Sequence, residues 1–146
     1  MSLFGQGATG LPEPAMVDFM RLELPRSPNA CFGAPPGFPV AGQIETPLYP
    51  VPPERLFAVL LALAEGFPRT WLLRAWPGEA GGDAQAQWVE RSARLGFPDL
   101  VNAAAVPRAG GSGLLIYSRS RIGWSDLGVN RSRVEAWIAG LEMAVR

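Results

Sequence analysis

Apolar residues recur at helical spacing in two parts of the chain. The first part follows Pro53, a residue suited to the first turn of a helix, and is ended by Gly66 and Pro68. Its apolar stripe consists of Leu56, Phe57, Leu60, Leu61 and Ala64. The second part, at the end of the chain, has a stripe of Val134, Trp137, Ile138, Leu141 and Val145. We expect a helix in each part, the second one capped by the side chain of Asn130.

Strand-like segments separate the two helices. Residues 87–97 alternate, with Val89 and Arg91 on one face and Trp88 and Glu90 on the other. The other segments between the helices that we expect to be strands are 70–76, 100–106 and 113–122. An earlier strand is predicted at residues 43–49, on the edge of the sheet, where Pro47 is tolerated.

This order of elements predicts an α+β fold of the pattern β-α-β-β-β-β-α. Short connections between consecutive strands require antiparallel pairing. Two apolar helices can then cover one face of the sheet, while the other face is left to water. We expect a curved antiparallel sheet with the layout of TATA-binding-protein-like and helix-grip domains, an analogy of fold that does not extend to function.

Proline is dense in the first third of the chain. Because proline lacks a backbone N–H and blocks helix interiors, this part cannot form long regular elements. We therefore predict an irregular N-terminal arm over residues 1–42 that lies on the domain, and a single α+β domain over residues 43–146. Residues 16–24 form one short piece, either helical or extended.

The amino-acid composition limits the kinds of catalysis and of binding site that this chain can provide. The chain of 146 residues has no histidine, its basic residues are all arginine, and Cys31 is its single cysteine. Histidine-dependent catalytic triads, the usual zinc sites and lysine Schiff-base chemistry are thereby excluded within this chain. A formal net charge of zero argues against nucleic-acid binding, which requires surplus positive charge. We expect no metal and no cofactor.

The sequence contains no apolar run long enough to span a membrane and no signal-peptide pattern. We expect a cytoplasmic protein.

Polar residues are concentrated between the last strand and the last helix. The residues of interest are Arg119, Arg121, Asp126, Asn130, Arg131 and Arg133. Arg131 and Arg133 fall in the first turn of the predicted helix, where the helix dipole disfavours cations, so carboxylates of the protein or a bound anion should compensate. The cluster is either a salt-bridge and capping network that fixes this turn, or a pocket in which arginine forks bind an anionic ligand.

Three other side chains are candidates for roles of their own. Arg91 shares a strand face with apolar residues, so it should pair with a carboxylate, for which Asp99 and Asp126 are candidates, or border a ligand pocket. Trp124 lies in the polar loop, where it either forms a contact surface beside the arginines or covers the core. Cys31 has no histidine to activate it, so a nucleophilic role is disfavoured.

The stretch Tyr117–Arg133 resembles the motif SRSRxGxSDxGxNRxRxxxW of the domain of unknown function 1499 family. Two further stretches resemble the same family, namely Ser27-Pro28-Asn29 and Trp88–Ser92 with Phe97-Pro98-Asp99. The resemblance spans residues 25–145 and implies a bacterial or plastid-type protein with no established reaction. The chain departs from many members in having Ala30 between Asn29 and Cys31. Many members also carry an N-terminal membrane segment, which we do not expect here.

These observations favour a non-catalytic binding or scaffold module that uses the Arg-rich turn, which we define as residues 118–133. It would act as an accessory subunit of a protein assembly or as a carrier of a small hydrophobic or anionic ligand. The ligand- or partner-binding candidates are Arg91, Arg119, Arg121, Trp124, Asp126, Asn130, Arg131 and Arg133. The alternative is an enzyme in which Asp126 acts as base and Arg119 or Arg131 stabilises an oxyanion.

Overall fold

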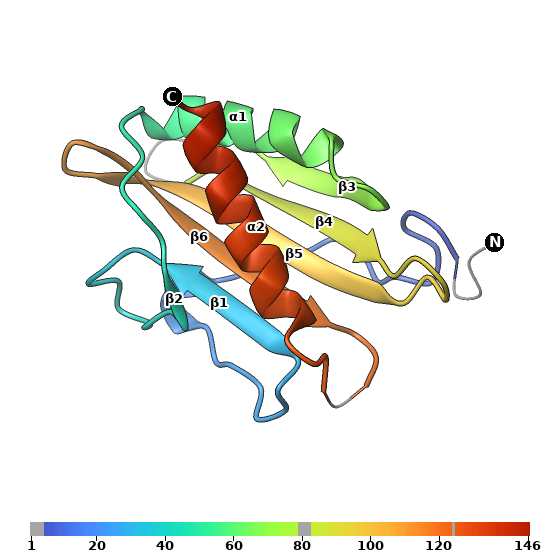
Figure 1. The fold of residues 1–146 in the computed structure, drawn as a ribbon. Helices are drawn as coiled ribbons and strands as arrows, with labels where there is room; N and C mark the ends of the chain where they lie inside the picture. The colour runs from blue at the N-terminus through green and yellow to red at the C-terminus, as the bar shows by residue number, and fades with distance from the viewer. Residues whose placement is uncertain (1–4, 79–82, 124) are drawn as a thin grey trace.

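A curved six-stranded sheet forms the centre of the protein, with strand order β2-β1-β6-β5-β4-β3 (Figure 1). The computed structural model describes residues 5–78, 83–123 and 125–146. The strands are β1 (Ala30–Ala34), β2 (Ile44–Glu45), β3 (Thr70–Trp76), β4 (Gln85–Arg91), β5 (Pro98–Arg108) and β6 (Gly111–Ser120). A short 3-10 helix, η1 (Phe19–Arg21), and two α-helices, α1 (Pro53–Glu65) and α2 (Val129–Ala144), complete the fold.

Both α-helices cover the same face of the sheet. Their buried residues form one core with the inward-facing residues of the strands, as the two apolar stripes predict. Trp137 of α2 packs edge-on against Trp88 of β4, with ring centroids 5.1 Å apart. The residues that line this core on the sheet are Cys31, Ala86, Trp88, Val101, Ala103, Ala105, Leu114 and Ile116. Burial of these apolar surfaces is the main stabilising term of the fold.

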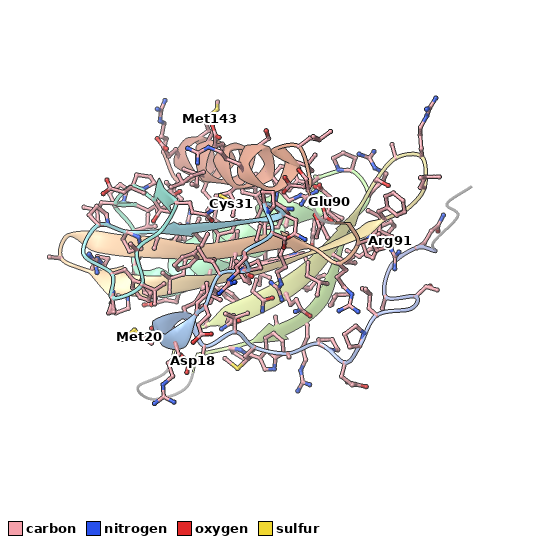
Figure 2. All side chains as sticks on the ribbon, turned by 90° about the horizontal axis from the view of Figure 1, so that it is seen from below. Asp18, Met20, Cys31, Glu90, Arg91 and Met143 are labelled. Carbon is pink, nitrogen blue, oxygen red and sulfur yellow. The ribbon has the colours of Figure 1, made fainter. Side chains whose placement is uncertain are left out.

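The N-terminal arm covers the opposite face of the sheet. Figure 2 shows α2 with Met143 on one side of the sheet and the arm with Asp18 and Met20 on the other. Phe19 of the arm stacks on Phe32 of β1, with ring centroids 6.0 Å apart. The expectation that this face is left to water was therefore wrong, because strand alternation places Phe32, Leu115 and Tyr117 there and these side chains need cover.

The structure adds one strand to the predicted order. β1 falls within the part of the chain that we expected to be irregular, and it lies between β2 and β6. β1 pairs in parallel with β2 and antiparallel with β6, so the sheet is mixed rather than purely antiparallel. Its Ala- and Gly-containing sequence has low strand propensity. Its small residues instead suit a closely packed position, because a Cβ on Gly33 would lie only 3.0 Å from Ile116 Cγ2. The division of the chain at residue 42 stays a prediction.

The four strands from β3 to β6 form the predicted antiparallel meander. The segment predicted as a strand over 87–97 is a strand only to Arg91, where a turn begins. In that turn the Gly96 N–H donates to Ser92 O at 3.1 Å, and Gly96 adopts a φ of 72° that favours glycine. Within β4 the predicted alternation of faces is observed: Trp88 packs on the helix side of the sheet, whereas Arg91 binds the arm on the opposite side.

None of the helices in the described part of the chain is long and apolar enough to cross a membrane.

Candidate functional site

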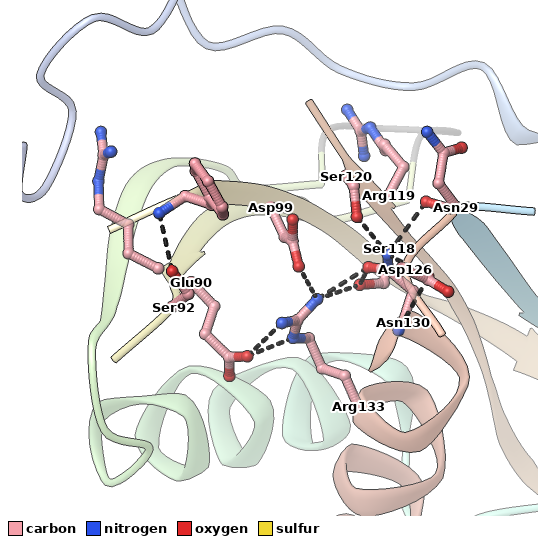
Figure 3. Close-up of polar contacts among 12 residues, drawn as sticks. Asn29, Glu90, Ser92, Asp99, Ser118, Arg119, Ser120, Asp126, Asn130 and Arg133 are labelled. Atoms are coloured by element: carbon pink, nitrogen blue, oxygen red, sulfur yellow. Dashed lines mark hydrogen bonds and ion pairs between the residues drawn. The ribbon is translucent and has the colours of Figure 1, made fainter. Parts of the chain in front are cut away.

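A buried ion cluster joins the beginning of α2 to the ends of two strands (Figure 3). Arg133 binds Glu90 of β4 through its Nε and Nη2 atoms, and its Nη1 lies 2.9 Å from Asp99 Oδ2 of β5. The side chain of Arg133 is only 7% exposed. Two carboxylates of the protein therefore compensate the arginine near the positive end of the helix dipole, one of the two possibilities that the sequence left open.

Amide and hydroxyl groups extend this cluster. Asn130 Oδ1 accepts hydrogen bonds from Arg133 Nη1 at 2.8 Å and from Ser118 Oγ at 2.5 Å. On its other side, Asn130 Nδ2 contacts Ser120 Oγ at 2.9 Å and the main-chain oxygen of Asn29 at 3.0 Å. Within the described residues, no fully buried side-chain N or O atom lacks a hydrogen-bond partner. The cluster is thus a satisfied network that ties α2 to β6 and to Asn29, the residue before β1.

Asp126, and not Asn130, caps α2. Its Oδ1 accepts from the Gly128 N–H at 2.8 Å, and its Oδ2 accepts from the Asn130 N–H at 3.2 Å and from Asn130 Nδ2 at 2.7 Å. The predicted N-cap was wrong because α2 already begins at Val129, which places Asn130 inside the first turn. Burial alone would raise the pKa of Asp126, but these hydrogen bonds outweigh it and hold the pKa below its ordinary value.

The pKa of Asp99 is shifted in the opposite direction. Burial raises the pKa of this carboxyl above its ordinary value, and the nearby charge and hydrogen bond of Arg133 offset the burial only in part. Both carboxylates are committed to partners of the protein itself. These two carboxylates can therefore hold the turn rigid. The third carboxylate of the cluster, Glu90, lines together with Arg133 a pocket of about 280 Å³ beside α2.

The sheet separates two of the predicted site residues from this cluster. Figure 3 shows Arg119 pointing away from Arg133, towards the arm side of the sheet. Arg119 Nη1 donates to Asn102 Oδ1 at 2.8 Å, and its guanidinium carbon lies 4.8 Å from the centroid of the Tyr117 ring. Within the described residues no carboxylate is within ion-pair distance of Arg119. Burial lowers the pKa of Arg119 to about 10.

Arg91 also lies on the arm side. Its guanidinium donates to the main-chain oxygens of Gly7, at 3.0 and 3.1 Å, and of Thr9, at 2.6 Å. It also donates to Gly96 O at 2.8 Å. The carboxylates that we considered as its partners bind elsewhere, Asp99 to Arg133 on the other face of the sheet and Asp126 to the start of α2.

The remaining candidates of the Arg-rich turn lie at the surface. Arg121 is exposed, and Arg131 is exposed in an ion pair with Glu135 at 3.3 Å. Trp124 lies outside the described residues, so its expected role is not tested. Of the eight predicted residues, the buried cluster unites Asp126, Asn130 and Arg133.

Apolar side chains project from the same turn. Leu127 is 94% exposed, and its neighbours Ile122 and Val129 are 45% and 48% exposed. Leu127 also has a φ of 54°, in the left-handed region that costs a residue with a side chain about 1–2 kcal/mol. The turn thus presents an apolar tip, which we define as Ile122, Leu127 and Val129.

A groove of about 910 Å³ lies between α2 and the loop that contains β2. Its walls combine apolar residues such as Ile44, Leu48 and Ile138 with the carboxylates of Glu45, Glu135 and Glu142. None of the predicted site residues lines it. The three carboxylates outnumber Arg108, which also lines the groove, and this balance disfavours an anionic ligand.

Sequence reasoning missed a row of buried amides on the arm side, formed by Gln85, Gln87 and Asn102. All three are buried, and each binds the main chain of the arm. A signal was present, since Gln85 and Gln87 stand two residues apart in a strand and therefore share a face. The partners of Arg133 were also absent from the predicted set, because Glu90 and Asp99 come from strands distant in sequence.

The described residues contain no group of three His, Cys, Asp or Glu side chains that could hold a metal ion. Cys31 is buried, and burial raises the pKa of its thiol, which disfavours the reactive thiolate.

The fold and the ion cluster around Arg133 define an α+β protein in which an arginine-centred network fixes the turn between the last strand and the last helix. Residues 24–141 match a family described as "Protein of unknown function (DUF1499)". The chain belongs to this family, as the motifs in the Arg-rich turn suggest. No curated protein and no solved structure matches this chain.

Proposed function

We propose that this protein is a non-catalytic binding module that docks onto a partner protein through the apolar tip of the Arg-rich turn. The observation that carries the proposal is Leu127, which is 94% exposed and held at a φ of 54°. A leucine in this position costs backbone free energy and gains no burial within the chain. A partner that buries it would supply the missing compensation.

The buried network prepares the turn for binding. Asp126 and Asn130 fix the main chain on the helix side of the tip, and Asn29 Nδ2 donates to Gly123 O at 3.0 Å on the other side. A surface that is already ordered loses little conformational entropy when it binds. Arg121 is exposed and directly precedes Ile122 of the apolar tip, so the expected partner surface has an apolar pocket with a carboxylate at its edge.

The geometry gives less support to an enzyme based on Asp126. Both oxygens of Asp126 already accept hydrogen bonds from the start of α2. Arg119, the proposed oxyanion donor, contacts Asn102 on the arm side of the sheet, and Arg131 is paired with Glu135. A general base and an oxyanion donor have to converge on one substrate position, and these residues do not.

The test is native mass spectrometry of the tagged protein, produced in its own source at its natural abundance. The wild type is compared with the variant Leu127→Asp. Met143→Asp is the matched control, because Met143 is 73% exposed but lies at the far end of α2, about 20 Å from the turn. We expect the wild type and Met143→Asp to carry the same protein partner and Leu127→Asp to lose it. A partner retained by Leu127→Asp, or a bound small molecule without a protein partner, would contradict the proposal.

A second candidate function is the binding of an anionic group at Arg119. Its support is the burial of this guanidinium with no carboxylate within ion-pair distance in the described part of the chain, since a bound anion would offset the cost of burying the charge. If this candidate holds, small carboxylates or phosphate will raise the melting temperature of the wild type but not that of Arg119→Gln.

We further propose that the layout is of the helix-grip kind, on the ground that α2 lies across one face of the curved sheet (Figure 1). The cytoplasmic location stays a prediction.

A further inference from the structure

The arm is held to the sheet through its main chain. Gln85 Oε1 accepts a hydrogen bond from the Val17 N–H at 2.7 Å, and Gln85 Nε2 donates to the Val17 oxygen at 3.1 Å. The side-chain amide of Gln85 therefore satisfies both main-chain groups of one residue, as a neighbouring strand does in a sheet.

The same kind of contact is repeated along the arm. Two residues before Val17, the main-chain oxygen of Ala15 accepts from Asn102 Nδ2 at 3.1 Å and from Gln87 Nε2 at 3.4 Å. Further towards the N-terminus, Arg91 donates to the main-chain oxygens of Gly7 and Thr9. The sheet therefore contacts main-chain groups of the arm from Gly7 to Val17.

The amides are fixed before they meet the arm. Gln87 Nε2 donates to Asn102 Oδ1, and Asn102 Nδ2 donates to Gln85 Oε1, each at 2.9 Å. Gln85, Gln87 and Asn102 are 4%, 4% and 0% exposed. We call these three residues the amide row. An amide row that is ordered by its own hydrogen bonds binds a main chain at little entropic cost.

The side chains of the arm contribute little along the amide row. Ala15 is exposed, and Met16, between the two residues that are bound, is 52% exposed. Glu13 is exposed as well. The side chain of Val17 is partly buried against the cluster that contains Phe32. Apart from this contact, recognition of the stretch rests on main-chain groups, which every polypeptide without proline at the donor position carries.

Residues 7–17 of the arm lie outside the part of the chain that matches the family. The match begins at residue 24, whereas the amide row and Arg91 fall within it. The groups that bind therefore lie within the matched residues, and the bound segment precedes them.

We infer that the sheet face opposite the helices is a binding site for the main chain of a polypeptide segment, and that residues 7–17 occupy it as a ligand supplied by the same chain. This segment forms turns at residues 7–10 and runs without regular secondary structure over residues 11–17. This site shares no residue with the docking surface proposed above, since the apolar tip lies between the end of β6 and the start of α2. The covalent connection gives the arm an effective concentration in the millimolar range, which keeps the site filled.

The test separates the arm from the site after the full chain has folded. A specific protease site is inserted between Pro25 and Arg26, which are both exposed, and the folded chain is cut there. A fluorescent synthetic peptide of residues 5–24 is then added, and its anisotropy is followed. We expect saturable binding, about tenfold or more weakened by N-methylation of Val17, which removes the donor to Gln85. The control peptide Met16→Ala should bind within about twofold of the parent.

Two results would overturn the inference. One is the absence of peptide binding to the cut protein, and the other is equal binding of the parent and the N-methylated peptide. A second measurement on the uncut chain guards against unfolding on cleavage. There, Gln85→Ala should speed hydrogen exchange of the Val17 amide about tenfold or more, while the Tyr49 amide, bonded to Ser112 O at 2.9 Å, keeps its protection. Unchanged exchange at Val17 would contradict main-chain recognition by Gln85.

Discussion

Arg133 Nη1 lies 2.9 Å from Asp99 Oδ2, and this contact joins the beginning of α2 to the beginning of β5. Both side chains are largely removed from water, at 7% and 14% exposure. Removal of one partner from such a pair leaves the other charge buried without compensation, which costs far more than the pair itself contributes. Stability should therefore depend on Arg133 much more than on the other arginines of the turn.

Arg133→Met is expected to lower the free energy of unfolding by about 3 kcal/mol, because Glu90 and Asp99 lose their shared cation. Urea denaturation followed by circular dichroism measures the change. The matched control is Arg131→Met, two residues earlier in the same helix, where the ion pair with Glu135 is exposed and the expected loss is below about 1 kcal/mol. Equal losses in the two variants would show that burial of the Arg133 cluster is energetically unimportant.

Asp126 should make stability depend on pH through its cap on α2. Its pKa is lowered in the folded protein, so its stabilisation is present above the ordinary value of 3.8 and is lost as pH falls through the folded value. Asp126→Asn is expected to lower the free energy of unfolding by about 1 kcal/mol at pH 7, because the amide keeps only one of the two oxygens that accept hydrogen bonds from Gly128 and Asn130. The difference from the wild type should shrink as pH falls below about 4.

Denaturant titrations between pH 7 and pH 3 measure this difference. Glu65→Gln, which removes an exposed carboxylate at the end of α1, serves as the control and should change stability by less than about 0.5 kcal/mol at pH 7. A wild-type advantage over Asp126→Asn that stays constant down to pH 3 would mean that the ionised carboxylate is not its source.

Leu127→Asn should raise stability while it weakens binding. Asparagine tolerates the left-handed conformation better than leucine, and a side chain that is 94% exposed contributes no packing, so a gain of about 0.5 kcal/mol is expected. Leu72→Asn, at a 50% exposed position in β3, should bring no gain because asparagine is disfavoured in strands. The melting temperatures of both variants measure these changes. A lower stability of Leu127→Asn would show that the left-handed conformation of Leu127 is not strained, and the proposed function would lose this support.

Much of the fold could be predicted from local patterns. The stripes of α1 and α2 and the meander from β3 to β6 follow from spacings of three to four and of two residues, which local geometry imposes. The family could be inferred from the Arg-rich turn because its motif is contiguous. β1 could not be found in this way, since its short Ala- and Gly-containing sequence becomes a strand only between β2 and β6 and beneath α2.

The sequence by itself determined both α-helices and the meander from β3 to β6, where the polar residues concentrate and which chemistries the chain lacks. Only the tertiary structure decided how the arginines are used. Arg119 and Arg133 belong to the same short motif, yet the strand that carries Arg119 directs it to the arm side, while the helix directs Arg133 to Glu90 and Asp99 on the other face. Those carboxylates come from β4 and β5, and the amide row meets an arm about 70 to 90 residues earlier in the chain. Strand order and register bring such distant residues into contact, and the spacing of residues along one segment does not encode strand order or register.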